Sequence, residues 1–408
     1  MCVAASRECF GDGDAETSLA NYILFPNTFK FFYVGYQNSL NEEALSSEMG
    51  TPYLSTDPTK CNQKRCFNIM PNHRKRRPRV GLTDMPEVVM KNILEKSNFQ
   101  SILKLRKVSR DFRNFIDDEK PEFHLEIIGI HMTSEQIKIF LKGLSENEAP
   151  HIEYQKHEKG CQIVCSRRTK SKTYLLENED FVEVFCRELE QIMSHQKNSV
   201  LLSFSLTAPN IPDEFKRILK AKPIPIKTQI FAMTTKTHSQ VMDVLPHMNP
   251  KYLKELCFYS SANSPHKKWI FDGIVESDQW KTAKTLEAVQ FFVDVPLKNF
   301  HHFSAGNYFV NAVTAEELFE LKENYLNSNK LKRVFIGYLD EEPLKEQELH
   351  VLFGKPYFPN PRRKVDRGRW YFRVAETDSA IHFVLYFAKT LQLSLVNLSE
   401  VPSNAELR

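Results

Sequence analysis

The sequence is poor in glycine, with only 13 among 408 residues. Loops that cradle phosphate groups need closely spaced glycines, and neither G-x-G-x-x-G nor G-x-x-x-x-G-K-[ST] occurs. The catalytic patterns G-x-S-x-G and H-E-x-x-H are absent as well. These absences argue against an enzyme, and we expect a non-catalytic protein that needs no cofactor.

The sequence also lacks an excess of charge of one sign. Its 55 basic and 51 acidic residues leave a net charge of +4, which gives no overall attraction to nucleic acid or anionic lipid. Long apolar runs are missing too, because the most apolar stretch, residues 19–36, is interrupted by Asn21, Pro26, Asn27 and Lys30. The acidic beginning does not fit a secretory signal. We therefore expect no membrane partner and a location in the cytoplasm, the nucleus or both.

A disulfide framework is not visible among the 8 cysteines, which are scattered along the chain. We interpret them as free thiols in a reducing compartment. Cys61, Cys66 and His73 come closest to a zinc site, but their spacing departs from the common patterns and a fourth ligand is missing. The sequence therefore predicts no metal site.

Residues 1–78 differ from the rest of the chain. Hydrophobic periodicity is weak there, and Ser, Thr, Asn and Pro are frequent between 38 and 72. We expect a poorly structured N-terminal extension. It ends in the basic run HRKRRPR at 73–79, whose simplest interpretation is a solvated linker; the alternative is a nuclear-import signal or a nucleic-acid patch.

Short amphipathic helices are predicted between residues 79 and 122. Asp84 and Pro86 are typical of a helix start, and the apolar residues that follow recur three or four positions apart. Because two or three short helices have little room for an internal core, they carry more apolar surface than they can bury by themselves. Such surplus apolar surface usually marks a docking site for another protein.

This segment resembles an F-box. It departs from the family's motif at Met85, where leucine is usual, and at Val88, where an acidic residue is common. The other motif elements occur in the family's order: Pro86-Glu87, Ile93-Leu94, Leu103, the run from Leu105 to Arg110, and Phe112-Arg113.

The resemblance implies that these helices bind the Skp adaptor, which connects F-box proteins to a cullin scaffold in a modular ubiquitin ligase. It also implies which side chains face the adaptor, although each of them could instead only hold the helices together. These residues are Leu82, Pro86, Ile93, Leu94, Leu103 and Val108.

Residues 123–400 alternate strand-like with helix-like stretches, which predicts an α+β or α/β fold. We expect a strand at 123–131, a helix at 134–144, an antiparallel meander between 151 and 178 and a helix at 178–195. Strand followed by helix predicts right-handed units with parallel strands, arranged as an irregular arch of leucine-rich-repeat type. The strand-like cores of these units lie at 200–206, 226–233, 252–259, 285–292 and 330–338.

An F-box followed by such a region resembles the nematode F-box proteins that carry an FTH domain, whose repeated strands are similar to LKELCFY and LKRVFIG here. The resemblance implies that the chain is the substrate-recognition subunit of a Skp–cullin–F-box ubiquitin ligase, with residues 123–400 capturing a protein target. It does not identify that target.

A basic and aromatic segment at 360–374 is the main competing feature. Its simplest interpretation is a β-hairpin with residues 366–368 at the tip, Trp370 and Phe372 buried, and Tyr371 and Arg373 outside. Binding of single-stranded nucleic acid, together with 73–79, is the less favoured alternative. In a ligase, the segment would hold an acidic or phosphorylated target. The candidate target-binding residues are Arg362, Arg363, Arg367, Arg369 and Tyr371.

Overall fold

The computed structural model describes residues 85–143, 151–167, 170–261, 268–339, 344–359, 366–387 and 389–408. The predictions for the N-terminal extension and the basic run at 73–79 lie outside these residues, as do those for Leu82, Arg362 and Arg363. Residues 80–408 cluster into one compact unit. Within the described ranges, no helix is both long and apolar enough to cross a membrane.

A trio of short helices opens the described chain. Pro86 precedes the first helix, where its missing N–H costs no helical hydrogen bond. Asn98 and Ser109 cap the second and third helices, because their side chains accept hydrogen bonds from backbone N–H groups three residues further on. The helical trio consists of α3 (Glu87–Glu95), α4 (Phe99–Leu105) and α5 (Arg110–Glu119).

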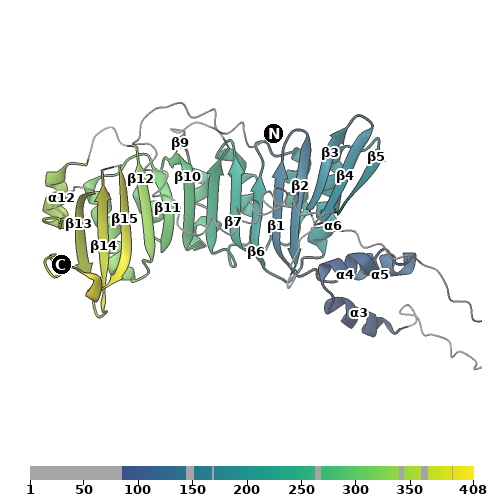
Figure 1. Cartoon of the computed structure of the whole chain (residues 1–408), viewed down its shortest axis with the longest axis horizontal. Helices are drawn as coiled ribbons and strands as arrows, with labels where there is room; N and C mark the ends of the chain where they lie inside the picture. The colour runs from purple at the N-terminus through teal and green to yellow at the C-terminus, as the bar shows by residue number, and fades with distance from the viewer. Residues whose placement is uncertain are drawn as a thin grey trace, which may run out of the picture. The chain divides into compact units, whose positions relative to one another are not determined.

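The rest of the unit is built on one sheet, which has 15 strands in the described part of the chain (Figure 1). Its strand order is β13-β14-β15-β12-β11-β10-β8-β7-β6-β1-β2-β3-β4-β5, and β9 pairs with β10 beside this path. The strands are β1 (Leu125–Met132), β2 (Gln136–Gly143), β3 (His151–His157), β4 (Gly160–Arg167), β5 (Lys170–Glu177), β6 (Leu201–Thr207), β7 (Thr228–Thr235), β8 (Glu255–Ser260), β9 (Lys268–Trp269), β10 (Thr285–Val293), β11 (Ala305–Val310), β12 (Arg333–Tyr338), β13 (Asp366–Arg373), β14 (Ser379–Tyr386) and β15 (Thr390–Asn397).

Helices connect many of these strands. Thr314 forms a reciprocal capping box with Glu317 at the start of the longest connecting helix of the C-terminal half. The helices are α6 (Phe181–Ser194), α7 (Asp213–Ala221), α8 (Ser239–Met242), α9 (Asp272–Val275), α10 (Asp278–Thr282), α11 (Ala315–Ser328) and α12 (Glu346–Phe353), and 3-10 turns lie at Leu245–His247, Leu297–Phe300 and Leu398–Glu400.

The central strands are parallel. From β6 through β7, β8, β10 and β11 to β12, each strand runs parallel to its neighbour, which confirms the parallel strands predicted between 200 and 338. Antiparallel strands extend the sheet at both ends, β2 to β5 on one side and β15, β14 and β13 on the other. The strand predicted at 123–131, the meander and the helix at 178–195 are confirmed as β1, β3 to β5 and α6.

The helix predicted at 134–144 is wrong, because this segment is strand β2. Its side chains alternate between buried and half-exposed, and Ile137, Ile139 and Leu141 lie on the buried side. Thr133 stabilises a tight turn before this strand: its hydroxyl oxygen accepts a hydrogen bond from the N–H of Gln136. The turn folds β2 back against β1. Every second side chain of β2 is then buried, and this alternation favours a strand over a helix.

The hairpin predicted at 360–374 is also placed wrongly. Residues 366–368 are not at a tip but begin β13, which pairs with β14 across a turn at 374–378. Trp370 and Phe372 are buried as predicted, but Tyr371, expected outside, is only 5% exposed. The outer edge of β13 is covered by the chain itself, since Tyr357 pairs with Arg369 and Leu407 with Tyr371. Tyr371 is buried because these segments of the chain lie along the outer edge of β13.

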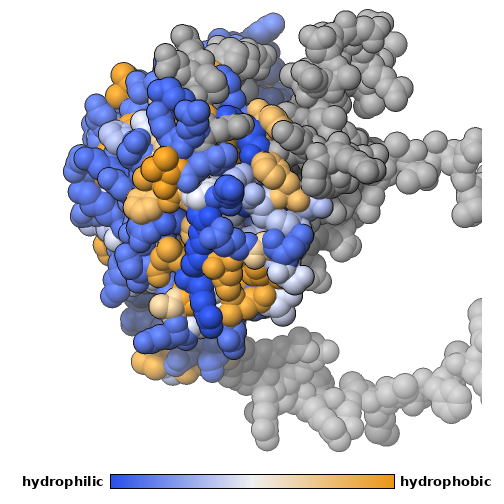
Figure 2. All heavy atoms as spheres, turned by 90° about the vertical axis from the view of Figure 1, so that its left-hand side faces the viewer, coloured by the Kyte–Doolittle hydropathy of each residue, from blue (hydrophilic) through white to orange (hydrophobic). Residues whose placement is uncertain are grey.

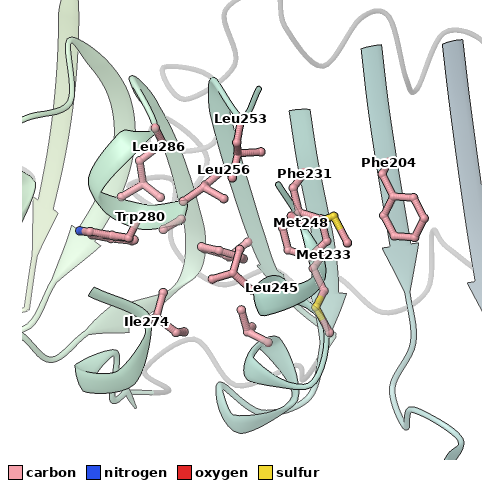
Figure 3. Close-up of a cluster of buried hydrophobic side chains, with 14 of the residues drawn as sticks. Phe204, Phe231, Met233, Leu245, Met248, Leu253, Leu256, Ile274, Trp280 and Leu286 are labelled. Atoms are coloured by element: carbon pink, nitrogen blue, oxygen red, sulfur yellow. The ribbon is translucent and has the colours of Figure 1, made fainter. Parts of the chain in front are cut away.

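The two faces of the sheet differ. On one face, apolar side chains from neighbouring parallel strands, among them Phe204, Phe231 and Leu256, belong to the same buried cluster as side chains of connecting segments such as Leu245 and Trp280 (Figure 3). This face supplies most of the hydrophobic core. On the other face, which we call the open face, lie the alternate residues of the same strands, and no described helix lies over it in Figure 1.

Candidate functional site

The helical trio exposes apolar side chains that its own core does not cover. Val88, Val89 and Val108 are 69%, 41% and 67% exposed. Burying such side chains against a partner is worth about 1.5–3 kcal/mol each. The apolar surface predicted from the sequence is therefore present on these helices.

The residues predicted to face an adaptor fall into three classes. Pro86 and Val108 are exposed and free to meet a partner. Ile93 and Leu103 are half-buried and offer part of their surface. Leu94 is only 3% exposed and belongs to the hydrophobic core, so its main role is to hold the helices together. Ile93 and Leu94 also line a small apolar hollow, together with Met90, Leu105, Phe112 and Phe115.

Ion pairs brace the trio. Arg106 donates two hydrogen bonds to Asp117, of 2.7 and 2.9 Å, which link the residue after α4 to α5. The Arg106 guanidinium holds the pKa of Asp117 below its usual value. Lys91 of α3 reaches both Glu87 and, at 3.0 Å, Glu119 of α5. These contacts fix the three helices relative to one another.

The trio is joined to the sheet through a buried aromatic stack. Phe123, just before β1, packs edge-on against Phe99 of α4 and lies flat against the ring of His195, whose centroid is 4.1 Å away. His195 Nδ1 is 3.0 Å from the carbonyl oxygen of Pro121, so this nitrogen carries the proton and donates. Beside the stack, the Glu122 carboxylate accepts hydrogen bonds from the backbone N–H groups of residues 197–199.

This stack makes the unit sensitive to acid. Burial lowers the pKa of His195, although the Pro121 carbonyl opposes the shift. The folded state therefore binds the His195 proton less readily than the unfolded chain, whose histidines titrate near ~6.5. We expect the free energy of unfolding to fall as the pH drops from 7.5 to 5.5, and His195→Gln to make this fall shallower in urea titrations. His350→Gln changes an exposed histidine and should leave the pH dependence of the free energy of unfolding as in the wild type. The same pH dependence in all three proteins would contradict the assignment of this acid sensitivity to His195.

The candidate target-binding residues on β13 lie at the end of the sheet that faces the viewer in Figure 2, where hydrophilic residues surround smaller apolar patches. Arg367 donates a hydrogen bond to the carbonyl oxygen of Leu344. Arg369 is half-buried, and its backbone pairs with Tyr357. The Tyr371 ring is stacked on His382 at 4.6 Å. A buried, stacked Tyr371 has little surface to offer a target, so the described residues give it a structural role.

A cluster that the sequence analysis missed lies near the middle of the open face. Glu255 and Cys257 are on β8, and Glu287 is on β10 directly beside Cys257. Their carboxylate oxygens and thiol sulfur lie within 4.8 Å of one another, close enough for one cation to contact all three groups. The only sequence signal was the alternation of Glu255 and Cys257 on one strand, and it needed the register with β10 to be recognised.

The thiols of the described residues are not activated. Burial raises the pKa of Cys161 to about 11 and that of Cys186 to about 12. Burial also raises the pKa of Cys257 well above its usual value, and Glu255 adds to the shift. These side chains are protonated at neutral pH and behave as small apolar groups in the core.

Comparison with protein families matches residues 82–124 to the F-box domain and residues 209–356 to the FTH domain. Among curated proteins, the chain is similar to F-box A protein 224 from Caenorhabditis elegans, with 23% identity over 253 residues. The match spans 60% of this chain and 62% of that relative, so the chain covers less than two thirds of the relative's length. No solved structure matches the chain.

Proposed function

We propose that this chain, whose residues 82–124 and 209–356 match the F-box and FTH domains, is the substrate-recognition subunit of a Skp–cullin–F-box ubiquitin ligase. In this proposal residues 79–122 form a three-helix F-box that docks on the Skp adaptor and, through it, on the cullin. Residues 123–400 form a leucine-rich-repeat-like arch that captures the protein target. The chain acts without catalysis, in the cytoplasm, the nucleus or both.

The exposed apolar surface of the helical trio is the observation that carries this proposal. Val108 and Pro86 are both exposed, and the resemblance to the F-box motif implies that they face the adaptor. A monomer gains nothing from leaving such side chains in water, whereas an apolar partner surface would cover them. The sheet supports the second half of the proposal, because its parallel strands present a broad face that no described helix covers.

The proposal is tested by purifying the full chain from cells and counting co-purified proteins by mass spectrometry. We expect the Skp adaptor and a cullin in near-stoichiometric amounts. Because the contact is apolar, the adaptor should remain bound in 0.5 M salt, whereas binding to nucleic acid falls steeply with salt. A salt-sensitive chain that carries nucleic acid and no adaptor would contradict the proposal.

A further inference from the structure

Two carboxylates on the open face have no cationic partner among the residues that the structure describes. Glu255 and Glu287 are both half-buried; Glu255 accepts a hydrogen bond from the Cys257 thiol, and Glu287 accepts one from the Tyr259 hydroxyl. Within the described ranges, neither carboxylate forms a salt bridge. Burial raises the pKa of Glu287, and the hydrogen bond from Tyr259 only partly opposes the shift. Partly desolvated carboxylates of this kind weaken the free protein unless a cation compensates them.

The chemistry of the cluster favours a cationic side chain over a metal ion. A metal bound to Cys257 would have to displace the proton that the buried thiol donates to Glu255 at 3.4 Å, which costs binding free energy. An ammonium or guanidinium group needs only the carboxylate oxygens as acceptors. It would bind without removing a proton from the cluster.

The surroundings of the two carboxylates suit an interface centre. Directly paired residues of neighbouring strands share a face, which places Ile230 beside Glu255 and Val289 beside Tyr259. Both apolar side chains are half-buried, so each has surface left to cover. Apolar residues around a polar anchor exclude water and strengthen the central ion pair.

A charge of the opposite sign lies along the same row of the open face. The register places Glu255 level with Thr285 of β10, Ala305 of β11 and then Arg333 of β12. Arg333 is exposed, and its guanidinium lies 4.6 Å from the centre of the Phe335 ring. Three strand spacings separate Glu255 from Arg333, about 14 Å, which an extended chain spans with about four residues.

We propose that the open face binds an extended segment of the target protein, with a lysine or arginine between Glu255 and Glu287 and an acidic residue about four positions away at Arg333. The inference deepens the proposed function and rests on it, because it assumes that this unit captures a protein. It specifies the chemistry of the captured segment, which crosses the strands on the side of the sheet opposite the helices.

A library of synthetic nine-residue peptides tests this inference. The full chain, bound to purified Skp adaptor, is applied to arrayed peptides in which one position is fixed as Lys, Arg, Asp, Glu or Gly. We expect retention of peptides with a fixed Lys or Arg, strengthened by Asp or Glu four positions away. Glu287→Gln and Glu255→Gln should each weaken binding of the selected peptides at least fivefold, and Arg333→Gln should remove the preference for the second, acidic position.

Glu276→Gln is the matched control, since it neutralises an exposed glutamate away from the open face, and it should leave peptide binding within twofold of wild type. Circular dichroism verifies that each variant is folded. Selection of acidic peptides only, no selection at all, or cation selection that survives Glu287→Gln and Glu255→Gln would each overturn the inference. Adaptor binding is measured on the same samples: an adaptor-bound chain without peptide selection defeats this inference alone, whereas a folded chain without adaptor defeats the proposed function.

Discussion

Replacing Val108 by aspartate should weaken binding of the Skp adaptor about 10- to 100-fold. The valine would exchange water for an apolar surface on binding, while a carboxylate at the same place would have to lose its hydration without a partner. Because Val108 is 67% exposed, the substitution leaves the helical trio folded, and the effect can be assigned to the interface. The dissociation constant, measured by calorimetry with the full chain, reports it.

Val88→Asp is the matched control. Val88 is 69% exposed, so the chemical change and the solvent exposure are nearly the same. The F-box motif commonly has an acidic residue at this position, so we expect the dissociation constant to stay within about threefold of wild type. Wild-type affinity for Val108→Asp, with an unchanged circular dichroism spectrum, would mean that Val108 does not contact the adaptor.

Truncating Trp280 to alanine should lower the free energy of unfolding by about 3–5 kcal/mol. The indole is 1% exposed and packs edge-on against the rings of Phe271, Phe300 and Phe303. Its Nε1–H donates a hydrogen bond of 3.1 Å to the carbonyl oxygen of Asn299. The alanine variant loses both the ring contacts and this donor. Urea unfolding followed by circular dichroism measures the change.

Trp280→Phe keeps an aromatic ring at this position but removes the donor and part of the ring surface, and we expect a smaller loss of about 1–2 kcal/mol. Ile270→Ala, which trims an apolar side chain that is 52% exposed near the same cluster, should change stability by less than about 0.5 kcal/mol. A Trp280→Ala variant as stable as Ile270→Ala would show that the cluster around the indole is not a stabilising core.

The sequence was informative where one pattern had a single physical interpretation. The cores of β6, β7, β8, β10 and β12 are apolar runs separated by helix-like stretches, so the parallel order could be predicted. Strand β11 was missed, because Gly306 and Asn307 dilute its apolar character. Strands β14 and β15 were missed as well, although the apolar run SAIHFVLY of β14 is typical of a strand; only its pairing with β13 and β15 cannot be read from the local sequence.

The helix predicted at 134–144 was wrong because the sequence of β2 fits both a helix and a strand. The run from Ile137 to Leu141 contains apolar residues at both helical and strand spacings, and only its pairing with β1 and β3 selects the strand. The helical trio was easier, since its caps and apolar spacing agree. The sequence could not predict that Val108 is exposed and Leu94 is buried, because both residues are apolar and only their packing distinguishes them. Likewise, the cluster of Glu255 and Glu287 exists only through the register of two strands.

The two ends of the sheet differ in their protection against self-association. At β13, the backbone bridges to Tyr357 and Leu407 already occupy part of the outer edge. At β5, the last strand in the described order, residues 171–175 are all exposed, and they include Tyr174 and Leu175. An edge of this kind can template the growth of intermolecular β-structure, and the exposed charges of Lys172 and Glu177 on β5 oppose it. Among the described residues, the β5 end of the sheet is therefore the less protected of the two against self-association.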